Sequence, residues 1–259
     1  MPMQQTLDKL RELRLGGFVA ALLEQSQSKH YQELSFEERL GFLVEKEYTR
    51  RENLRLNTRL RNAKLKQSAS LEQVDFGVSR GLVKAKFLEL AECRWVSNRH
   101  SLILLGPTGV GKSFLACVLG DQACKFGYTV RYIKVQELLS ELLQARADGS
   151  FTAFWGKLQK TSLLIIDEWL RDPLSAADAR EILDLLDERY RKASCIFATQ
   201  LPVADWYRHI ADPTLAEAML DRIVHDSLRL ELQGESMRKL TTKLKGKKGG
   251  DASLRSDNH

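Results

Sequence analysis

Hydrophobic residues follow a helical pattern in the first quarter of the chain. Leu7, Leu10 and Leu13 recur at intervals of three residues, as on the buried face of an amphipathic helix. The segment that begins at Ser35 has the S-x-x-E spacing of a capping box, which predicts the start of a long helix. We therefore expect residues 1–66 to form a small all-helical domain.

The pattern changes after a polar linker at residues 67–75. Short apolar runs then alternate with helical stretches, which is typical of a parallel sheet covered by helices on both faces. We therefore expect an α/β domain over residues 76–240, and a Lys-, Gly- and Ser-rich tail over 241–259 that is predicted to be disordered. The strand-like runs are 101–105, 128–133, 163–166, 195–199 and 228–232, and the main helical stretches are 112–125, 136–147 and 176–192.

The strongest motif follows the first strand-like run. Residues 106–113 read GPTGVGKS and match G-x-x-x-x-G-K-[ST], a phosphate-binding loop between a strand and a helix. Glycines let backbone N–H groups wrap around phosphates, and the following helix presents its positive N-terminus to the same anions. Lys112 is expected to reach the β- and γ-phosphates of ATP, and Ser113 to ligate Mg²⁺. The predicted nucleotide-binding residues here are Gly106, Pro107, Thr108, Gly109, Val110, Gly111, Lys112, Ser113 and Phe114.

Two acids follow the strand-like run at 163–166. Asp167 is expected to hold Mg²⁺, and Glu168 to polarise the water that attacks the γ-phosphate. An acid at the second position favours ATP hydrolysis over phosphoryl transfer to a small molecule. The next strand-like run ends in Thr199 and Gln200, and either side chain is a candidate to face the γ-phosphate. The predicted catalytic residues within this domain are thus Lys112, Glu168, and Thr199 or Gln200.

Composition and charge point to a second partner. The chain has 259 residues, of which 43% are hydrophobic, so wholesale disorder and a disulfide scaffold are excluded. Basic residues are concentrated in two places: residues 46–66 hold eight Lys or Arg and two acids, and residues 238–259 hold seven and two. A mildly acidic body with two basic extensions is typical of contact with a polyanion, although a solvated helix and tail have the same composition.

The cysteines and the N-terminus predict a cytoplasmic protein. None of the four cysteines forms a C-x-x-C pair, so the chain lacks the spacing of a zinc or thioredoxin-like site. Scattered cysteines are typical of buried thiols in a reducing compartment. The sequence contains neither a signal peptide nor an apolar run of about 18 residues, so no membrane partner is expected.

These motifs, in this order, resemble those of the AAA+ ATPases. The closest resemblance is to the IstB family, helper ATPases of bacterial insertion-sequence transposition that are related to helicase loaders. It covers nearly the whole chain: LDKLRELRLGGFVAALLEQ near the N-terminus, GPTGVGKS, LLIIDE, LDRI at 220–223 and GESMR at 234–238. The resemblance implies an AAA+ P-loop fold with a small C-terminal lid, preceded by an all-α domain.

The resemblance also implies roles for two arginines. Arg222 lies where such ATPases place an arginine finger, which reaches the nucleotide of the adjacent subunit. Arg238 lies where the same fold places a sensor arginine, which contacts the nucleotide of its own subunit. A homo-oligomer with active sites shared between subunits, and ATP and Mg²⁺ as cofactors, follow from the same resemblance. One departure is Thr199-Gln200, where related sequences often have Thr-Asn or Ser-Asn.

Basic residues of the helical domain are candidates for DNA contact. Arg51, Arg55 and Arg59 recur every four residues, so a helix places them on one face, where they repel one another unless an anion lies between them. No aromatic residues are interleaved for base stacking, which favours duplex phosphates over single strands. The alternative is an exposed basic helix that docks on the acidic body of the chain or on a partner protein. The predicted DNA-contacting residues are Arg50, Arg51, Arg55, Arg59, Lys66, Lys134, Arg146, Lys157 and Lys160.

The leading functional hypothesis is an ATP-dependent, oligomer-forming ATPase that binds and deforms duplex DNA. In that scheme it recruits and regulates a cognate transposase, which performs the strand chemistry, and it acts in the bacterial cytoplasm on the nucleoid. The alternative is a helicase loader that acts on a replicative helicase and single-stranded DNA. A non-enzymatic nucleotide-dependent binding module would require Glu168 to be idle.

Overall fold

In the computed structural model, residues 3–237 are described. They divide into two compact units, with the boundary between Thr58 and Arg59. The domain boundary that the sequence predicts at residue 66 stays a prediction. The predicted lid residues after Met237, Arg238 among them, and the tail at 241–259 lie outside the described residues.

The first unit is helical. It contains α1 (Met3–Glu12), α2 (Gly16–Gln27), the 3₁₀ helix η1 (Lys29–Glu33) and most of α3 (Phe36–Ala63). The capping box at the start of α3 is present, because the Ser35 N–H donates to Glu38 at 2.8 Å and the Glu38 N–H donates to Ser35 Oγ at 3.2 Å. The predicted N-terminal helical region is therefore confirmed.

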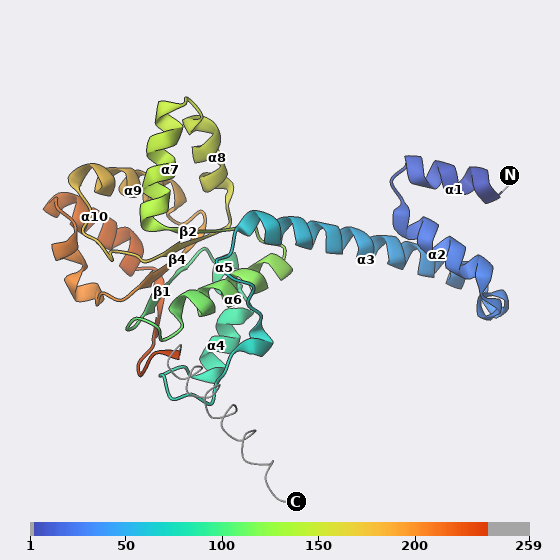
Figure 1. The fold of residues 1–259 in the computed structure, drawn as a ribbon, viewed down its shortest axis with the longest axis horizontal. Coiled ribbons are helices and arrows are strands. Elements are labelled where there is room, and N and C mark those ends of the chain that lie inside the picture. The colour runs from blue at the N-terminus through green and yellow to red at the C-terminus, as the bar shows by residue number, and fades with distance from the viewer. Residues whose placement is uncertain (1–2, 238–259) are drawn as a thin grey trace, which may run out of the picture. The chain divides into compact units, whose positions relative to one another are not determined.

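The second unit is built on a five-stranded parallel sheet. Its strands are β1 (Ser101–Leu105), β2 (Val130–Lys134), β3 (Leu163–Asp167), β4 (Ser194–Thr199) and β5 (Ser227–Glu231), in the spatial order β2-β3-β4-β1-β5 (Figure 1). All pairings are parallel, so the carboxyl ends of the strands share one edge of the sheet. β1 and β3 end at this edge and lead into the phosphate loop and the two acids, respectively.

Helices cover both faces of the sheet. α6 (Lys112–Lys125) packs on one face, while α7 (Val135–Ala147), α8 (Phe151–Lys160), α9 (Ala176–Arg189) and α10 (Pro213–Val224) share a hydrophobic core with the other (Figure 1). The central strands β3 and β4 are wholly buried, which is why they read as continuous apolar runs. The predicted α/β fold with helices on both faces is confirmed. The remaining elements are η2 (Leu71–Gln73), α4 (Lys84–Ala91), α5 (Arg94–Ser97) and η3 (Val203–His209).

Three local predictions differ from the structure. The helix expected to reach residue 192 ends at Arg189, because the chain turns through a left-handed conformation at Arg191. The linker expected to be a polar connection is partly packed, with Ala69 and Val74 buried. α8 was not expected as a separate helix. Among residues 3–237, none of the helices has the length and apolarity that crossing a bilayer requires.

Candidate nucleotide site

The phosphate loop joins the carboxyl end of β1 to the amino end of α6. Gly109 and Gly111 both have positive φ, at +83° and +103°, a conformation that favours glycine. A Cβ on Gly111 would also lie 2.8 Å from Nη1 of the buried Arg80, so a side chain there would have to displace that guanidinium. The first turn of α6 therefore opens toward the loop with its unpaired N–H groups, as in an anion-binding site.

The loop lysine is buried. Lys112 Nζ donates to the carbonyl oxygens of Gly106 at 2.7 Å and Pro107 at 2.9 Å. Burial lowers the pKa of Lys112, and the negative charge of Asp167 opposes that effect. The ammonium group is thus held inside the loop, where the sequence predicts contact with phosphates.

Asp167 is the centre of a hydrogen-bonded cluster. Ser113 Oγ donates to Asp167 Oδ2 at 2.6 Å, and the Tyr132 hydroxyl donates to the same oxygen. Lys66 Nζ lies 3.6 Å from this oxygen, and the Glu168 N–H donates to Oδ1 at 2.9 Å. Burial, and then the hydrogen bond to Asp167, raises the pKa of Tyr132, so the hydroxyl keeps its proton.

The Ser113 and Asp167 oxygens fit the requirements of Mg²⁺. A hydroxyl and a carboxylate are hard oxygen ligands, and Mg²⁺ typically takes one or two protein oxygens together with phosphate and water oxygens. Ser113 Oγ and Asp167 Oδ2 lie 2.6 Å apart, so both oxygen ligands are available at one place beside the phosphate loop. Within the described residues, no cluster of three or more His, Cys, Asp or Glu offers another metal site.

Glu168 is restrained by two cations. Lys134 Nζ lies 3.1 Å from Glu168 Oε1, and Arg171 Nη1 donates to Glu168 Oε2. Glu168 also has a left-handed backbone conformation, with φ at +57°. Lys134 was predicted to contact DNA, and in the structure its ammonium group pairs with the predicted catalytic base. Arg171 was missed, because nothing in the sequence pattern distinguishes it from other surface arginines.

The structure gives Thr199 and Gln200, the two candidates at the end of β4, different contacts. Gln200 Oε1 accepts a hydrogen bond from the phosphate-loop hydroxyl Thr108 Oγ1 at 2.5 Å. The Thr199 side chain is buried and accepts from the N–H of Leu201 at 3.0 Å, so it stabilises its own turn. Gln200 is therefore the one whose side chain contacts the phosphate loop.

The last described residues, Ser236 and Met237, pack against the phosphate loop. The Met237 N–H donates to Gly109 O at 2.9 Å, and the Ser236 side chain packs against Gly109. A cavity of about 280 Å³ lies over the loop, lined by Lys66, Gln67, Gly109, Gly111, Lys112, Ser113, Phe114 and Met237. Five of the predicted nucleotide-binding residues therefore line one cavity: Gly109, Gly111, Lys112, Ser113 and Phe114. Val110, which lies between them in the sequence, is buried.

Arg80 was not predicted from the sequence. Its guanidinium is buried behind the loop and donates to Val110 O at 3.3 Å and Asp75 O at 3.0 Å. Burial lowers its pKa, and the charge of Asp75 opposes that effect. Its Nη1 group also lies close to Gly111, so this buried cation packs against the phosphate loop and bonds to its backbone.

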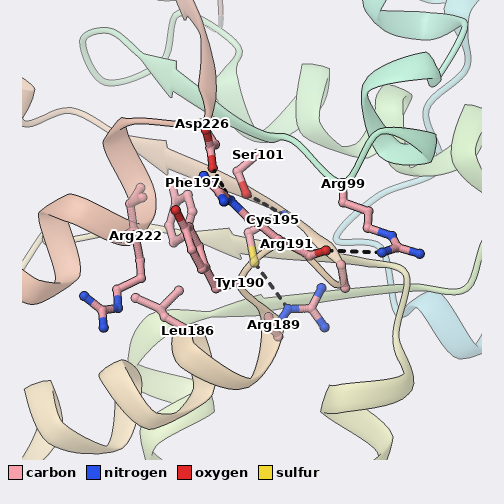
Figure 2. A pocket seen from close by; sticks show the side chains of 12 residues that line it. Arg99, Ser101, Leu186, Arg189, Tyr190, Arg191, Cys195, Phe197, Arg222 and Asp226 are labelled. Carbon is pink, nitrogen blue, oxygen red and sulfur yellow. Dashed lines mark hydrogen bonds and ion pairs between the residues drawn. The ribbon is translucent and has the colours of Figure 1, made fainter.

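Arg222 lies at the opposite edge of the sheet from the phosphate loop. It lines a small pocket with Ser101 and Cys195, which lie at the amino-terminal ends of β1 and β4 (Figure 2). The phosphate loop follows the other end of β1. Arg222 Nε lies 2.5 Å from Asp187 Oδ1, and its side chain is 32% exposed. Arg222 is therefore separated from the nucleotide cavity of its own chain by the length of the sheet.

Most of the predicted DNA-contacting arginines have internal partners. Arg50 and Arg51 bind Glu47 at 2.9 and 2.7 Å, and Arg55 binds Glu52 at 2.6 Å. These carboxylates neutralise part of the charge along the stripe, and the DNA contact predicted for these arginines stays a prediction. In the second unit, Arg59 donates to the carbonyl oxygen of Cys124, and Arg146 pairs with Glu181 and lies over the ring of Phe151. Lys157 and Lys160 are exposed.

Comparison with known proteins identifies close sequence relatives. Residues 8–245 match the family model described as IstB-like ATP binding protein. The chain is 41% identical over 234 residues to an insertion sequence ATP-binding protein, y4pL, of Sinorhizobium fredii, covering 90% of this chain and 96% of the relative. It is also 41% identical over 203 residues to the ATP-binding protein of insertion sequence IS1162 from Pseudomonas fluorescens, covering 78% and 88%.

Solved structures support the fold. The crystal structure of DnaI superimposes with a TM-score of 0.56 at 22% identity, covering 68% of this chain and 93% of that chain. The replication initiator DnaA bound to AMPPCP and single-stranded DNA gives a TM-score of 0.56 at 19% identity, covering 74% and 58%. At these identities the likeness shows a shared fold. The family resemblance expected from the sequence is confirmed by the sequence relatives.

Proposed function

The chain belongs to the family of IstB-like ATP binding proteins, and we propose that it is an ATP-hydrolysing helper of insertion-sequence transposition. The observation that carries this proposal is the 2.6 Å contact of Ser113 with Asp167, beside Glu168 and below the buried Lys112. This arrangement supplies a phosphate cradle, a set of Mg²⁺ ligands and a general base at the carboxyl ends of β1 and β3. Hydrolysis of ATP to ADP and phosphate is the reaction that it fits.

Each residue of the site has a distinct task in this proposal. The loop backbone and Lys112 bind the triphosphate and orient the γ-phosphate. Ser113 and Asp167 would hold Mg²⁺, which neutralises phosphate charge when bound. Glu168 accepts the proton of the attacking water, and the Gln200 amide, next to Thr108, positions that water or the γ-phosphate. Tyr132 keeps Asp167 in place through its hydrogen bond.

A complete active site in this proposal requires two subunits. Arg222 stays charged, and its guanidinium suits a bidentate contact with γ-phosphate oxygens. Its place at the far edge of the sheet supports a contact with the nucleotide of an adjacent subunit rather than its own. The protein is therefore proposed to assemble into a homo-oligomer, in which ATP joins neighbouring subunits. Arg238 is proposed to contact the nucleotide within its own subunit.

Duplex DNA and a transposase are the proposed macromolecular partners. Relatives are named as insertion sequence proteins, which supports a role in transposition in the bacterial cytoplasm. Bending a short duplex costs on the order of 1–6 kcal/mol, so phosphate contacts from several subunits are needed to deform the target. The oligomer would hold deformed DNA for the transposase, and hydrolysis would release it.

ATP turnover with duplex DNA, single-stranded DNA and no DNA tests the proposal. We expect duplex DNA to stimulate turnover, and addition of the transposase to stimulate it further. The E168Q variant should bind ATP and DNA but lose turnover, which ties the activity to this site. Stimulation by single strands alone would favour the helicase-loader alternative, and turnover that persists in E168Q would exclude the proposed role of Glu168.

A further inference from the structure

The edge strand β2 forms the floor of a basic groove within residues 59–237. β2 pairs only with β3, so one of its sides has no neighbouring strand. The groove encloses about 750 Å³, and its walls come from the last turn of α3 and the residue after it on one side and from α8 on the other. We call this cavity the β2 groove; its charged lining residues are Arg61, Lys64, Arg131, Glu141, Lys157 and Lys160.

Four cations of the β2 groove have no carboxylate partner among residues 3–237. Glu141 is the acidic residue that lines the β2 groove. Arg131 Nη2 donates to both carboxylate oxygens of Glu141, at 3.0 and 3.1 Å. Arg131 and Glu141 therefore neutralise each other. Within the part of the chain that the structure describes, the side chains of Arg61, Lys64, Lys157 and Lys160 make no ion pair, and all four are exposed.

The four cations form two pairs that face a common space. Lys157 and Lys160 are three residues apart on α8, so both lie on the same side of that helix. Arg61 and Lys64 are also three residues apart, and Lys64 follows the end of α3 in a left-handed conformation. Like charges gathered in one concavity repel one another, and an anion between them removes that repulsion.

We propose that the β2 groove binds the phosphate backbone of duplex DNA, an inference that rests on the proposed function. Long Lys and Arg side chains that lack carboxylate partners are suited to sequence-independent phosphate contacts. Phe154 is the one aromatic side chain in the groove, and it packs partly against the hydrophobic core, so the groove lacks a stacking platform for unpaired bases. The groove thus fits a duplex better than a single strand.

The β2 groove leads to the nucleotide site. A second hollow of about 350 Å³ shares Lys64 and Arg131 with the groove and is also lined by Lys66 and Lys134. The ammonium group of Lys134 binds Glu168, and that of Lys66 lies near Asp167. A phosphate backbone that extends along β2 competes with Glu168 for Lys134. DNA in the groove therefore weakens a restraint on the predicted catalytic base.

Anisotropy of a labelled 30-base-pair duplex, titrated with full-length protein and ATPγS at several salt concentrations, tests the β2 groove. The test variant is R61Q/K64Q/K157Q/K160Q, and its ATPγS affinity should match that of the wild type, which shows that it is folded. Each lost phosphate contact lowers the slope of log K against log salt by about 0.9. For four lost contacts we expect the slope to fall by about 3.6 and the affinity at low salt to fall at least about tenfold.

A matched variant controls for net charge. R94Q/R180Q/K192Q/R208Q removes the same number of charges from exposed residues of the same unit outside the groove, and it should bind the duplex like the wild type. Equal losses in both variants, or a wild-type slope in the groove variant, would overturn the inference. Displacement of the duplex by poly-glutamate as effectively as by unlabelled DNA would assign the groove to an acidic protein instead. A wild type that does not bind duplex would overturn the proposed function itself.

Discussion

Lys134 Nζ lies 3.1 Å from Glu168 Oε1, so the predicted general base is held in an ion pair by the last residue of a neighbouring strand. Arg171 binds the other carboxylate oxygen. A carboxylate held by two cations is not free to turn toward a water at the γ-phosphate. In this conformation, Lys134 and Arg171 restrain Glu168, and a competing anion is needed to release it.

Removal of the Lys134 charge should raise ATP turnover in the absence of DNA. An ion pair at this level of exposure contributes about 1 kcal/mol or less, which limits the increase to about fivefold. The K134Q variant should also show a smaller ratio of turnover with DNA to turnover without it. Steady-state ATPase assays of K134Q and wild type, with K86Q as a control outside the site, measure both quantities. A lower basal rate with an unchanged ratio would contradict this restraint.

The Tyr132 hydroxyl should matter for Mg²⁺ rather than for ATP itself. Y132F removes the hydrogen bond to Asp167 while keeping the ring in the core. Loss of such a partner behind a metal ligand typically reduces metal affinity by about 10- to 100-fold. Titration of Mg²⁺ into protein with a fluorescent ATP analogue should show this shift, and binding in EDTA should be the same for both proteins. An unchanged Mg²⁺ midpoint would show that Tyr132 does not position Asp167.

Arg222 should act on the nucleotide of another subunit. R222A should retain ATP binding and lose turnover by at least about 10³-fold, as for other arginine fingers. Mixing R222A with E168Q should restore part of the activity, because some interfaces then combine an intact Glu168 with an intact Arg222. R208Q, which removes an exposed arginine of η3, serves as the control. Two inactive variants that stay inactive when mixed would argue against a shared site.

Glu47 should make the stability of the helical unit depend on acid pH. Hydrogen bonds from Arg50, then from Arg51 and from the Gly17 N–H, which donates to Glu47 Oε2 at 2.6 Å, lower the pKa of Glu47 to about 2, although burial opposes the shift. A folded-state pKa below the ordinary value of 4.5 stabilises the folded state above about pH 4.5, and this stabilisation is lost as the pH falls toward 2.

Hydrogen exchange of α2 and α3 between pH 5 and pH 2 measures this effect. The protection of these helices in the wild type should fall over this range, and the E47Q variant should show lower protection at pH 5 with less dependence on pH. A substitution that tests the same contact sterically is G17A, because a Cβ on Gly17 would lie 2.6 Å from Glu47 Cα. Equal pH profiles for wild type and E47Q would contradict this account of Glu47.

The sequence predicted those parts of the site that depend on short segments. The phosphate loop, with Lys112 and Ser113, lies in one strand–loop–helix unit, and Asp167 ends a buried strand, so local pattern was sufficient. The choice between Thr199 and Gln200 was left open, because it depends on which side chain at the strand end meets the phosphate loop. Tyr132 was missed for a similar reason, since its partner belongs to the adjacent strand.

Charged surface residues were the least predictable. The Arg51 and Arg55 stripe was read as a polyanion site, but Glu47 and Glu52 on the same helix neutralise part of it. Lys66 was assigned to DNA by its place in a basic run, and its ammonium group lies near Asp167. Sequence periodicity places residues on a helix face, but the partner of each charge depends on side-chain geometry and on contacts between distant segments.

The central claim is that ATP controls how long the protein holds duplex DNA. Its most direct test is the dissociation rate of a labelled duplex from the full-length protein with ATPγS, with ADP and without nucleotide. We predict a long-lived complex with ATPγS and rapid release with ADP or without nucleotide, because the triphosphate joins Arg222 of one subunit to the phosphate loop of the next. Equal dissociation rates in all three conditions would contradict the account.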